Sequence, residues 1–112
     1  MGFKIGLAEK RKKKLEEELK LLIPKIIKAE VEKIILFGSL SHGNLHKTSD
    51  IDLIIVQKTE KRFLERLDEF YKYLNPSVAV DIFVYTPQEF EEMKRSSFMK
   101  SALRRGKVLY ER

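Results

Sequence analysis

The sequence predicts an α+β (α/β) domain in which helices pack against a small β-sheet. Three short segments are apolar and rich in β-branched residues, which is typical of buried strands. Longer segments between them carry apolar residues three and four positions apart, which is the period of an α-helix. Strands that alternate with helices favour a sheet covered by helices.

The first half of the chain contains one predicted helix and two predicted strands. The helix covers residues 8–29, and Pro24 within it is expected to kink it or to begin a second helix. A buried strand follows over residues 33–40, where Gly38 and Ser39 end an apolar run. The next strand covers residues 51–56. The apolar stripe of the helix consists of Leu15, Leu19, Leu22, Ile23 and Ile26.

The second half begins with a strongly amphipathic helix over residues 60–74, which Asn75 and Pro76 should end. A third strand is predicted over residues 77–85. Thr86, Pro87 and Glu89 then form the pattern of a helix start, with Thr86 as the N-cap and Glu89 as the reciprocal cap. One helix should run from there to Gly106, before a short edge strand over residues 107–110. The residues expected to face inward on this last helix are Phe90, Met93, Phe98 and Leu103.

The composition excludes several classes of protein. With 112 residues, positions 1–112 are expected to form a single domain. Without cysteine there is no disulfide framework, thiolate zinc site or cysteine nucleophile. The apolar runs are too short for a membrane span or a signal peptide, so we expect a cytoplasmic protein.

The net charge of +6 is concentrated near the C-terminus, where residues 94–112 hold seven basic residues and one acid. Such a segment indicates an anionic partner, although a solvated surface of the same sign explains it equally well. Nucleic acid is a less favoured partner, because aromatic residues are too sparse there for a stacking platform.

Two aspartates indicate a metal site. Asp50 and Asp52 are two residues apart at the start of a predicted strand, so both should project from one face. Carboxylates at this spacing suit a hard cation, Mg²⁺ or Mn²⁺. The alternative is that Asp50 caps a turn while Asp52 faces solvent.

Asp81 lies in the middle of an apolar strand, where an acid requires a partner or a metal. If this strand lies beside residues 51–56, the three carboxylates form one cluster suited to nucleotidyl transfer. The alternative for Asp81 is a structural salt bridge.

Gly38 would let the backbone approach a phosphate, and Ser39 could donate a hydrogen bond to that phosphate. Gly-Ser pairs also end many strands that bind no ligand.

Together these residues resemble the minimal nucleotidyltransferases of the DNA polymerase β superfamily. The resemblance rests on Gly38-Ser39, then Ser49-Asp50-Ile51-Asp52, and a later strand aspartate, Asp81. It implies a mixed sheet with a polymerase β palm-like fold and transfer of AMP from ATP. It also implies that Asp50 and Asp52 bind the metal, that Asp81 is the third ligand or the base, and that Gly38, Ser39 and Ser49 bind the nucleotide.

The sequence departs from this family at two positions. Many members read Gly-Ser-Arg-Ala-Arg-Gly, whereas Leu40 and His42 replace both arginines here. This difference weakens the expected clamping of phosphate, which His42 could partly restore when protonated. His42 and His46 are not expected to form a zinc pair, because the residues between them read as a turn.

The resemblance also implies a partner. Similar stand-alone domains act as antitoxins that add AMP to a tyrosine of a HEPN-type ribonuclease toxin. The leading hypothesis is this Mg²⁺-dependent protein adenylylation, since no residues remain for an acceptor-binding domain. Alternatively, the acceptor is a small molecule or RNA, or it is bound by a homo-oligomer. A third hypothesis is a binding antitoxin that neutralises its partner through the basic C-terminal helix, with Phe90, Met93 and Phe98 in contact rather than in the core.

Overall fold

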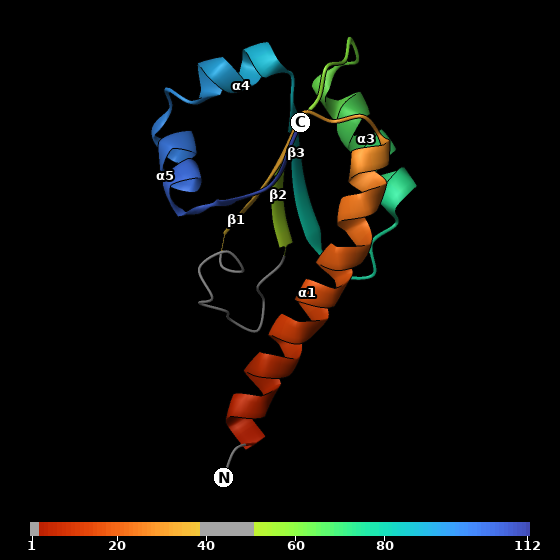
Figure 1. The fold of residues 1–112 in the computed structure, drawn as a ribbon, viewed down its shortest axis with the longest axis vertical. Coiled ribbons are helices and arrows are strands. Elements are labelled where there is room, and N and C mark those ends of the chain that lie inside the picture. Colours follow the sequence, from red (N-terminus) through yellow and green to blue (C-terminus); the bar gives the residue numbers. More distant parts are fainter. Residues whose placement is uncertain (1–2, 39–50) are drawn as a thin grey trace.

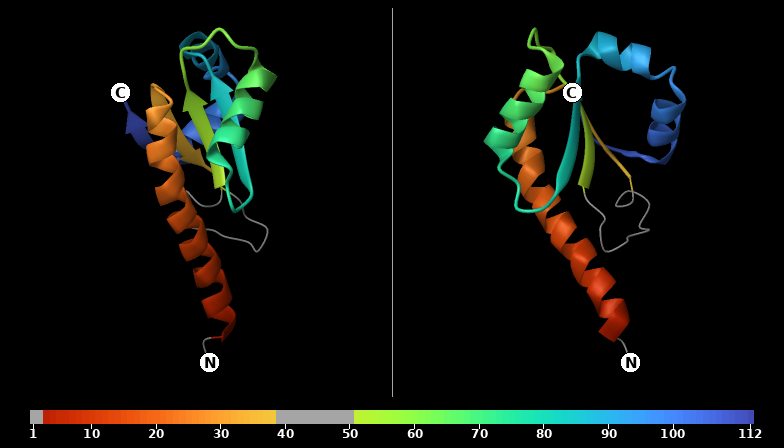
Figure 2. Two further views of the ribbon diagram at one scale, coloured as in Figure 1. Left: turned by 90° about the vertical axis from the view of Figure 1, so that its right-hand side faces the viewer. Right: turned by 180° about the vertical axis from the view of Figure 1, so that it is seen from behind.

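The computed structural model describes residues 3–38 and 51–112, which form a sheet with helices on both sides. The helices are α1 (Phe3–Lys28), α3 (Phe63–Leu74), α4 (Pro87–Met93) and α5 (Ser97–Arg105). The strands are β1 (Lys33–Phe37), β2 (Ile51–Val56), β3 (Val80–Tyr85) and β4 (Lys107–Glu111). Figure 1 shows α1 and α3 on one side of the sheet and α4 and α5 on the other, and Figure 2 shows the same arrangement from two further directions. The α+β prediction is confirmed.

The sheet is mixed, in the order β3-β2-β1-β4. β1 pairs antiparallel with both β2 and β4, while β2 and β3 are parallel and are joined through α3. The predicted edge strand is confirmed as β4, which lies beside β1 and carries exposed residues at several positions. This order places the start of β2 and the start of β3 side by side at one end of the sheet.

The first face of the sheet, the one covered by α1 and α3, holds the larger core. Leu53 and Ile55 from β2 are fully buried there against Leu22 and Ile26 of α1 and Phe70 of α3. These β2 residues alternate with Ile54 and Val56, which face the other way. Leu53 and Ile55 therefore form the side of β2 that packs against α1 and α3.

The second face is covered by α4 and α5. Ile35 of β1 and Ile54 of β2 pack there with Phe90 of α4 and Met99 of α5. Both faces of the central strands are thus buried along much of their length, which explains why β1 and β2 read as continuous apolar runs rather than as alternating ones.

Helix α1 is a single helix that passes through Pro24, so the expectation of a second helix starting there is wrong. Proline removes the N–H that would bond to the carbonyl of Lys20. Both Lys20 and Pro24 are exposed, so water can satisfy that carbonyl at little cost. No helix in the described part of the chain is long and apolar enough to span a membrane.

Helix α3 and strand β3 are shorter than predicted. The residues before α3 form a turn, in which the Thr59 hydroxyl accepts a hydrogen bond from the Lys61 N–H. The predicted end of α3 is confirmed, since Asn75 adopts the left-handed conformation at φ 42°.

Strand β3 begins at Val80 rather than at Ser77 because the Ser77 N–H and hydroxyl both donate to the buried Glu18 carboxylate of α1, at 2.8 and 2.7 Å. These bonds lower the pKa of Glu18.

The helix predicted up to Gly106 is in fact two helices. The capping box at Thr86 and Glu89 is confirmed at the start of α4. However, Ser96 starts a second helix, because its hydroxyl accepts a hydrogen bond from the Met99 N–H at 3.1 Å. This new start turns Met99 inward, where it is fully buried, and leaves Phe98 53% exposed. The expectation that Phe98 faces the core is therefore wrong, whereas Phe90 is buried and Met93 and Leu103 are partly buried, as predicted.

Candidate active site

Two of the three predicted carboxylates lie side by side at one end of the sheet. Asp52 and Asp81 are each the second residue of their strands, and they are direct partners in the parallel pairing of β2 with β3. Neighbouring strands lie about 4.8 Å apart. Both aspartates alternate with residues of the first core, Leu53 and Ile82, so both project from the second face. The carboxylate cluster was expected only if the third strand lies beside residues 51–56, and the structure meets this condition for Asp52 and Asp81.

Gly38 directly follows β1 and lies at the same end of the sheet as Asp52. Phe37 is the antiparallel partner of Asp52, which brings the next residue of β1 close to the carboxylate. A Cβ added at Gly38 would lie 2.1 Å from Asp52 Oδ2, and the φ of Gly38 is +78°. Glycine is required here on both counts. The nearest side chain to Gly38 is therefore that of Asp52, and the contact of Gly38 with a phosphate stays a prediction.

The two aspartates differ in exposure. Asp52 is half-buried and Asp81 is exposed. Within the part of the chain that the structure describes, no ion pair involves Asp81, so the structural salt bridge considered for it is not found. An exposed carboxylate beside a half-buried one is open to a ligand that approaches from the second face.

The remaining predicted site residues, Ser39, Ser49 and Asp50, lie outside the described residues, as do Leu40 and His42. Among residues 3–38 and 51–112 there is accordingly no group of three acidic, histidine or cysteine side chains that could hold a metal. The two carboxylates that are described supply oxygen ligands only. Such a donor set fits Mg²⁺ or Mn²⁺ and disfavours zinc.

An aromatic cluster adjoins the carboxylates, and sequence reasoning missed its significance. Phe98 of α5 contacts Phe37 and Phe83 with ring centroids 6.2 and 6.5 Å apart, and Phe37 and Phe83 are 6.0 Å apart. The serine at position 96 was the signal that could have revealed it. Ser96 shifts the start of α5 and thereby decides that Met99, and not Phe98, is the buried residue.

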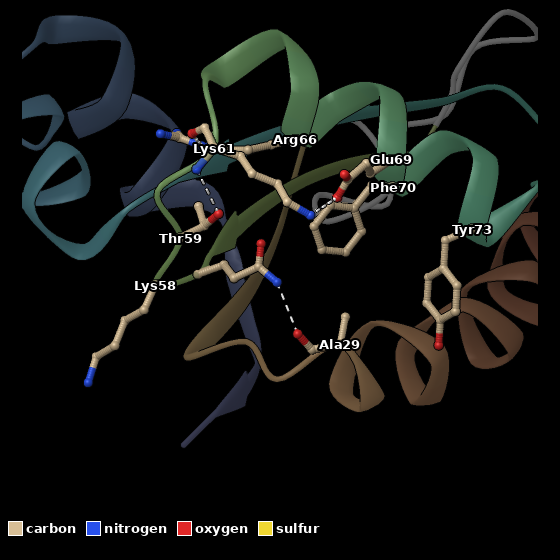
Figure 3. A pocket seen from close by; sticks show the side chains of 9 residues that line it. Ala29, Lys58, Thr59, Lys61, Arg66, Glu69, Phe70 and Tyr73 are labelled. Carbon is tan, nitrogen blue, oxygen red and sulfur yellow. Dashed lines mark hydrogen bonds and ion pairs between the residues drawn. The ribbon is translucent and has the colours of Figure 1, made fainter.

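A separate pocket lies at the opposite end of β2, lined by Gln57, Lys61, Glu69 and Tyr73 among others (Figure 3). Its polar groups already have partners. Lys61 pairs with Glu69, and the Gln57 amide donates to the Ala29 carbonyl at 2.9 Å. We therefore place the candidate active site at Asp52 and Asp81 rather than at this pocket.

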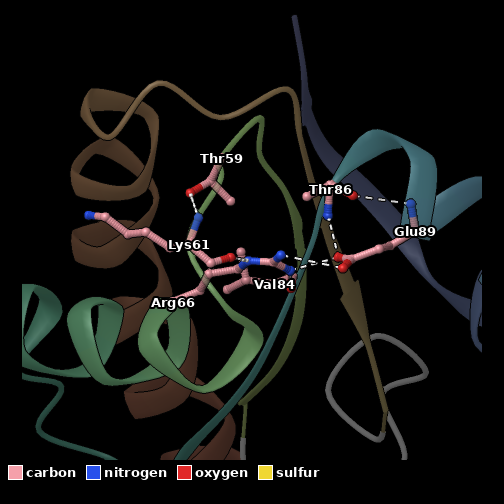
Figure 4. Close-up of polar contacts among 6 residues, drawn as sticks. All are labelled: Thr59, Lys61, Arg66, Val84, Thr86 and Glu89. Carbon is pink, nitrogen blue, oxygen red and sulfur yellow. Dashed lines mark hydrogen bonds and ion pairs between the residues drawn. The ribbon is translucent and has the colours of Figure 1, made fainter.

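Next to that pocket, an ion pair between a buried arginine and a partly exposed glutamate connects α3 to the start of α4 (Figure 4). Arg66 is 7% exposed and donates to Glu89 at 2.6 and 3.3 Å and to the Val84 carbonyl at 3.1 Å. The Arg66 guanidinium, together with hydrogen bonds from Thr86, lowers the pKa of Glu89. All these groups are engaged with one another, so we assign them a structural role.

The sequence matches a known protein family. The model of the family described as "Nucleotidyltransferase domain" matches residues 12–108. The chain belongs to this nucleotidyltransferase family. The match extends from α1 into β4 and includes both aspartates and Gly38, and it shows that the protein is a nucleotidyltransferase.

Two further similarities agree with this family. The nucleotidyltransferase is 32% identical over 84 residues to a Methanocaldococcus jannaschii protein named "Putative protein adenylyltransferase MJ0604", covering 74% of this chain and 82% of that protein. Its fold is similar to a crystal structure described as a "putative nucleotidyltransferase" from Sulfolobus solfataricus, with a TM-score of 0.67 and 20% identity over 94% of this chain and 87% of that one. At that identity the likeness shows the fold alone.

A third structure, titled "Crystal structure of the toxin-antitoxin with AMP-PNP", aligns with a TM-score of 0.46 and 23% identity. The alignment covers 90% of the nucleotidyltransferase and 73% of that chain. A TM-score this low bears on neither the fold nor the partners of the present protein.

Proposed function

We propose that this nucleotidyltransferase transfers AMP from ATP to a hydroxyl group of a protein, in a reaction that depends on Mg²⁺. The observation that carries the proposal is the pairing of Asp52 with Asp81 on parallel strands, beside a glycine that makes room for the Asp52 carboxylate. The relative named as a protein adenylyltransferase supports the choice of AMP and of a protein acceptor.

In the proposed reaction, the hydroxyl oxygen of the acceptor attacks the α-phosphorus of ATP. The bond between that phosphorus and the oxygen that bridges to the β-phosphate breaks, and pyrophosphate leaves with the electron pair. Asp52 and Asp81, together with Asp50, would hold Mg²⁺, which neutralises charge on the triphosphate. Asp81 is exposed on the second face and would also accept the proton of the attacking hydroxyl. Gly38, Ser39 and Ser49 would contact the nucleotide.

The proposed acceptor is a tyrosine of a HEPN-type ribonuclease toxin, which makes the protein an antitoxin. This part of the proposal rests on the resemblance of Gly38-Ser39, Asp50-x-Asp52 and Asp81 to the minimal nucleotidyltransferases. The competing candidate is an antitoxin that neutralises by binding alone, and the replacement of both family arginines by Leu40 and His42 is the observation that favours it.

Intact-mass spectrometry tests the proposal. The protein is incubated with a HEPN-type ribonuclease and Mg-ATP, and the ribonuclease is expected to gain the mass of one AMP. Asp52→Asn and Asp81→Asn should each lower the rate at least about 100-fold, because loss of a metal-binding carboxylate removes several kcal/mol of transition-state stabilisation. Asp68→Asn is the matched control, since Asp68 is an exposed α3 residue whose partner is Lys72.

The outcomes separate the candidates. An adduct that requires both Asp52 and Asp81 and disappears when the acceptor tyrosine becomes phenylalanine supports protein adenylylation. Neutralisation of the ribonuclease without any adduct, unaffected by either aspartate substitution, would establish the binding antitoxin instead. An adduct that Asp52→Asn leaves intact would refute the site.

A further inference from the structure

The exposed aromatic ring of Phe98 lies on the same face of the sheet as the candidate catalytic carboxylates. Phe37, which it contacts edge-on at 89°, is the cross-strand partner of Asp52. Phe83, its other contact, follows Asp81 by two residues on β3 and therefore shares its face, about 6.6 Å further along the strand. Phe98 is thus separated from each aspartate by a single intervening side chain, that of Phe37 or Phe83.

The two neighbouring rings support Phe98 but do not cover it. Phe37 is buried and Phe83 is partly buried, whereas Phe98 remains 53% exposed. The hydroxyl of Ser96 caps α5 two residues earlier and sets the direction in which Phe98 projects. A large aromatic side chain that is packed on one side and open on the other has the form of a stacking surface.

We propose that Phe98 stacks against the base of the nucleotide whose phosphates lie at Asp52 and Asp81. This inference rests on the proposed function, and it adds a base-binding residue to that site. The base is the favoured occupant because it is tethered to the triphosphate through the ribose. Any nucleotide held at the carboxylates therefore carries an aromatic ring into their immediate surroundings.

Stacking is tolerant of base identity but grows with the area of the ring. Phe98 therefore accounts for affinity for the base and for a preference for purine over pyrimidine nucleotides. It contributes nothing to the binding of inorganic tripolyphosphate, which has the same charged groups and no ring.

Calorimetric titration with Mn²⁺ present tests the inference, using ATP, UTP and inorganic tripolyphosphate as the probes. Phe98→Leu keeps an apolar side chain against Phe37 and Phe83 but removes the aromatic ring. It should weaken ATP binding about tenfold, which corresponds to about 1.4 kcal/mol of lost stacking. UTP binding should weaken less, and tripolyphosphate binding should not change. Phe98→Trp should preserve or strengthen ATP binding.

Leu64→Ala is the matched control, since Leu64 is 75% exposed on α3, on the other side of the sheet. The inference is overturned if Phe98→Leu binds ATP as tightly as the unmodified protein, or if it weakens ATP and tripolyphosphate equally. If the unmodified protein binds neither ATP nor tripolyphosphate, the proposed function fails and this inference fails with it. If ATP and tripolyphosphate both bind and the Phe98 substitutions leave their affinities unchanged, the inference about Phe98 is refuted and the proposed function is retained.

Discussion

At the scale of single residues, Gly38 and Asp52 show how the backbone of one strand determines the position of a side chain on the next. Gly38 adopts a positive φ directly after β1, and its missing Cβ leaves space that the Asp52 carboxylate fills. Gly106 is also tightly enclosed, but there a Cβ would meet the backbone carbonyls of Ala102 and Leu36, at 2.7 and 2.9 Å. The first glycine leaves room for a carboxylate of the candidate site, and the second leaves room for neighbouring backbone.

We therefore expect Gly38→Ala to impair activity out of proportion to stability. The methyl group would displace the Asp52 carboxylate, while the left-handed conformation adds about 1–2 kcal/mol of strain. Adenylylation rate and urea unfolding are measured on both Gly38→Ala and the comparison variant Gly106→Ala, under conditions in which each is folded. Gly106→Ala should lose stability and keep a larger share of its rate. If Gly38→Ala adenylylates at the rate of the unmodified protein, the role of Gly38 in placing Asp52 is refuted.

At the scale of elements, the turn between α4 and α5 determines where α5 begins and which of its residues are buried. The sequence pattern of apolar residues is continuous from Phe90 to Leu103, so it reads as one helix. The Ser96 cap interrupts it, and α5 starts with its own phase. A helical residue turns about 100° about the axis per position, so a new start changes which of two neighbouring residues is buried.

Removing this cap should destabilise α5. Ser96→Ala leaves the Met99 N–H without its partner, and we expect the free energy of unfolding to fall by about 1 kcal/mol. Ser101→Ala is the matched control, because Ser101 is exposed inside α5, where alanine is the better helix former. Urea unfolding of the two variants provides the measurement. Equal stability of the two would show that Ser96 does not cap the helix in solution.

At the scale of the whole molecule, the two helical layers are joined by the ion pair between Arg66 of α3 and Glu89 of α4 (Figure 4). Glu89 also closes the capping box by accepting a hydrogen bond from the Thr86 N–H at 2.8 Å. The pKa of Glu89 is lowered in the folded protein, chiefly by Arg66. Its carboxylate therefore stabilises the fold above the ordinary pKa of 4.5, and this contribution is lost as the pH falls through the lower folded pKa.

Glu89→Gln should isolate this charge, because glutamine can still complete the capping box. At neutral pH we expect the variant to be less stable by about 1 kcal/mol, a value reduced by the partial exposure of Glu89. Urea unfolding from about pH 7 down to about pH 3 should show the difference shrinking as Glu89 becomes protonated. The exposed Glu91→Gln on the same helix is the control. A difference that stays constant over this range would contradict the assignment.

The sequence by itself determined the order of the strands, the extent of β2, the capping box at Thr86 and the residue types of the candidate carboxylate site. These features are local, because hydrophobic period, proline and cap residues act within one or two turns of chain. The adjacency of Asp52 and Asp81 depends on which strands pair. Ser77 is not part of β3, because it donates its hydrogen bond to Glu18, which lies 59 positions away in the sequence. The Ser96 cap sets the start of α5, and the packing of that helix against the second face then buries Met99 and leaves Phe98 exposed. These features depend on contacts between segments that are distant in the sequence, and a local sequence pattern does not show which distant segments pair.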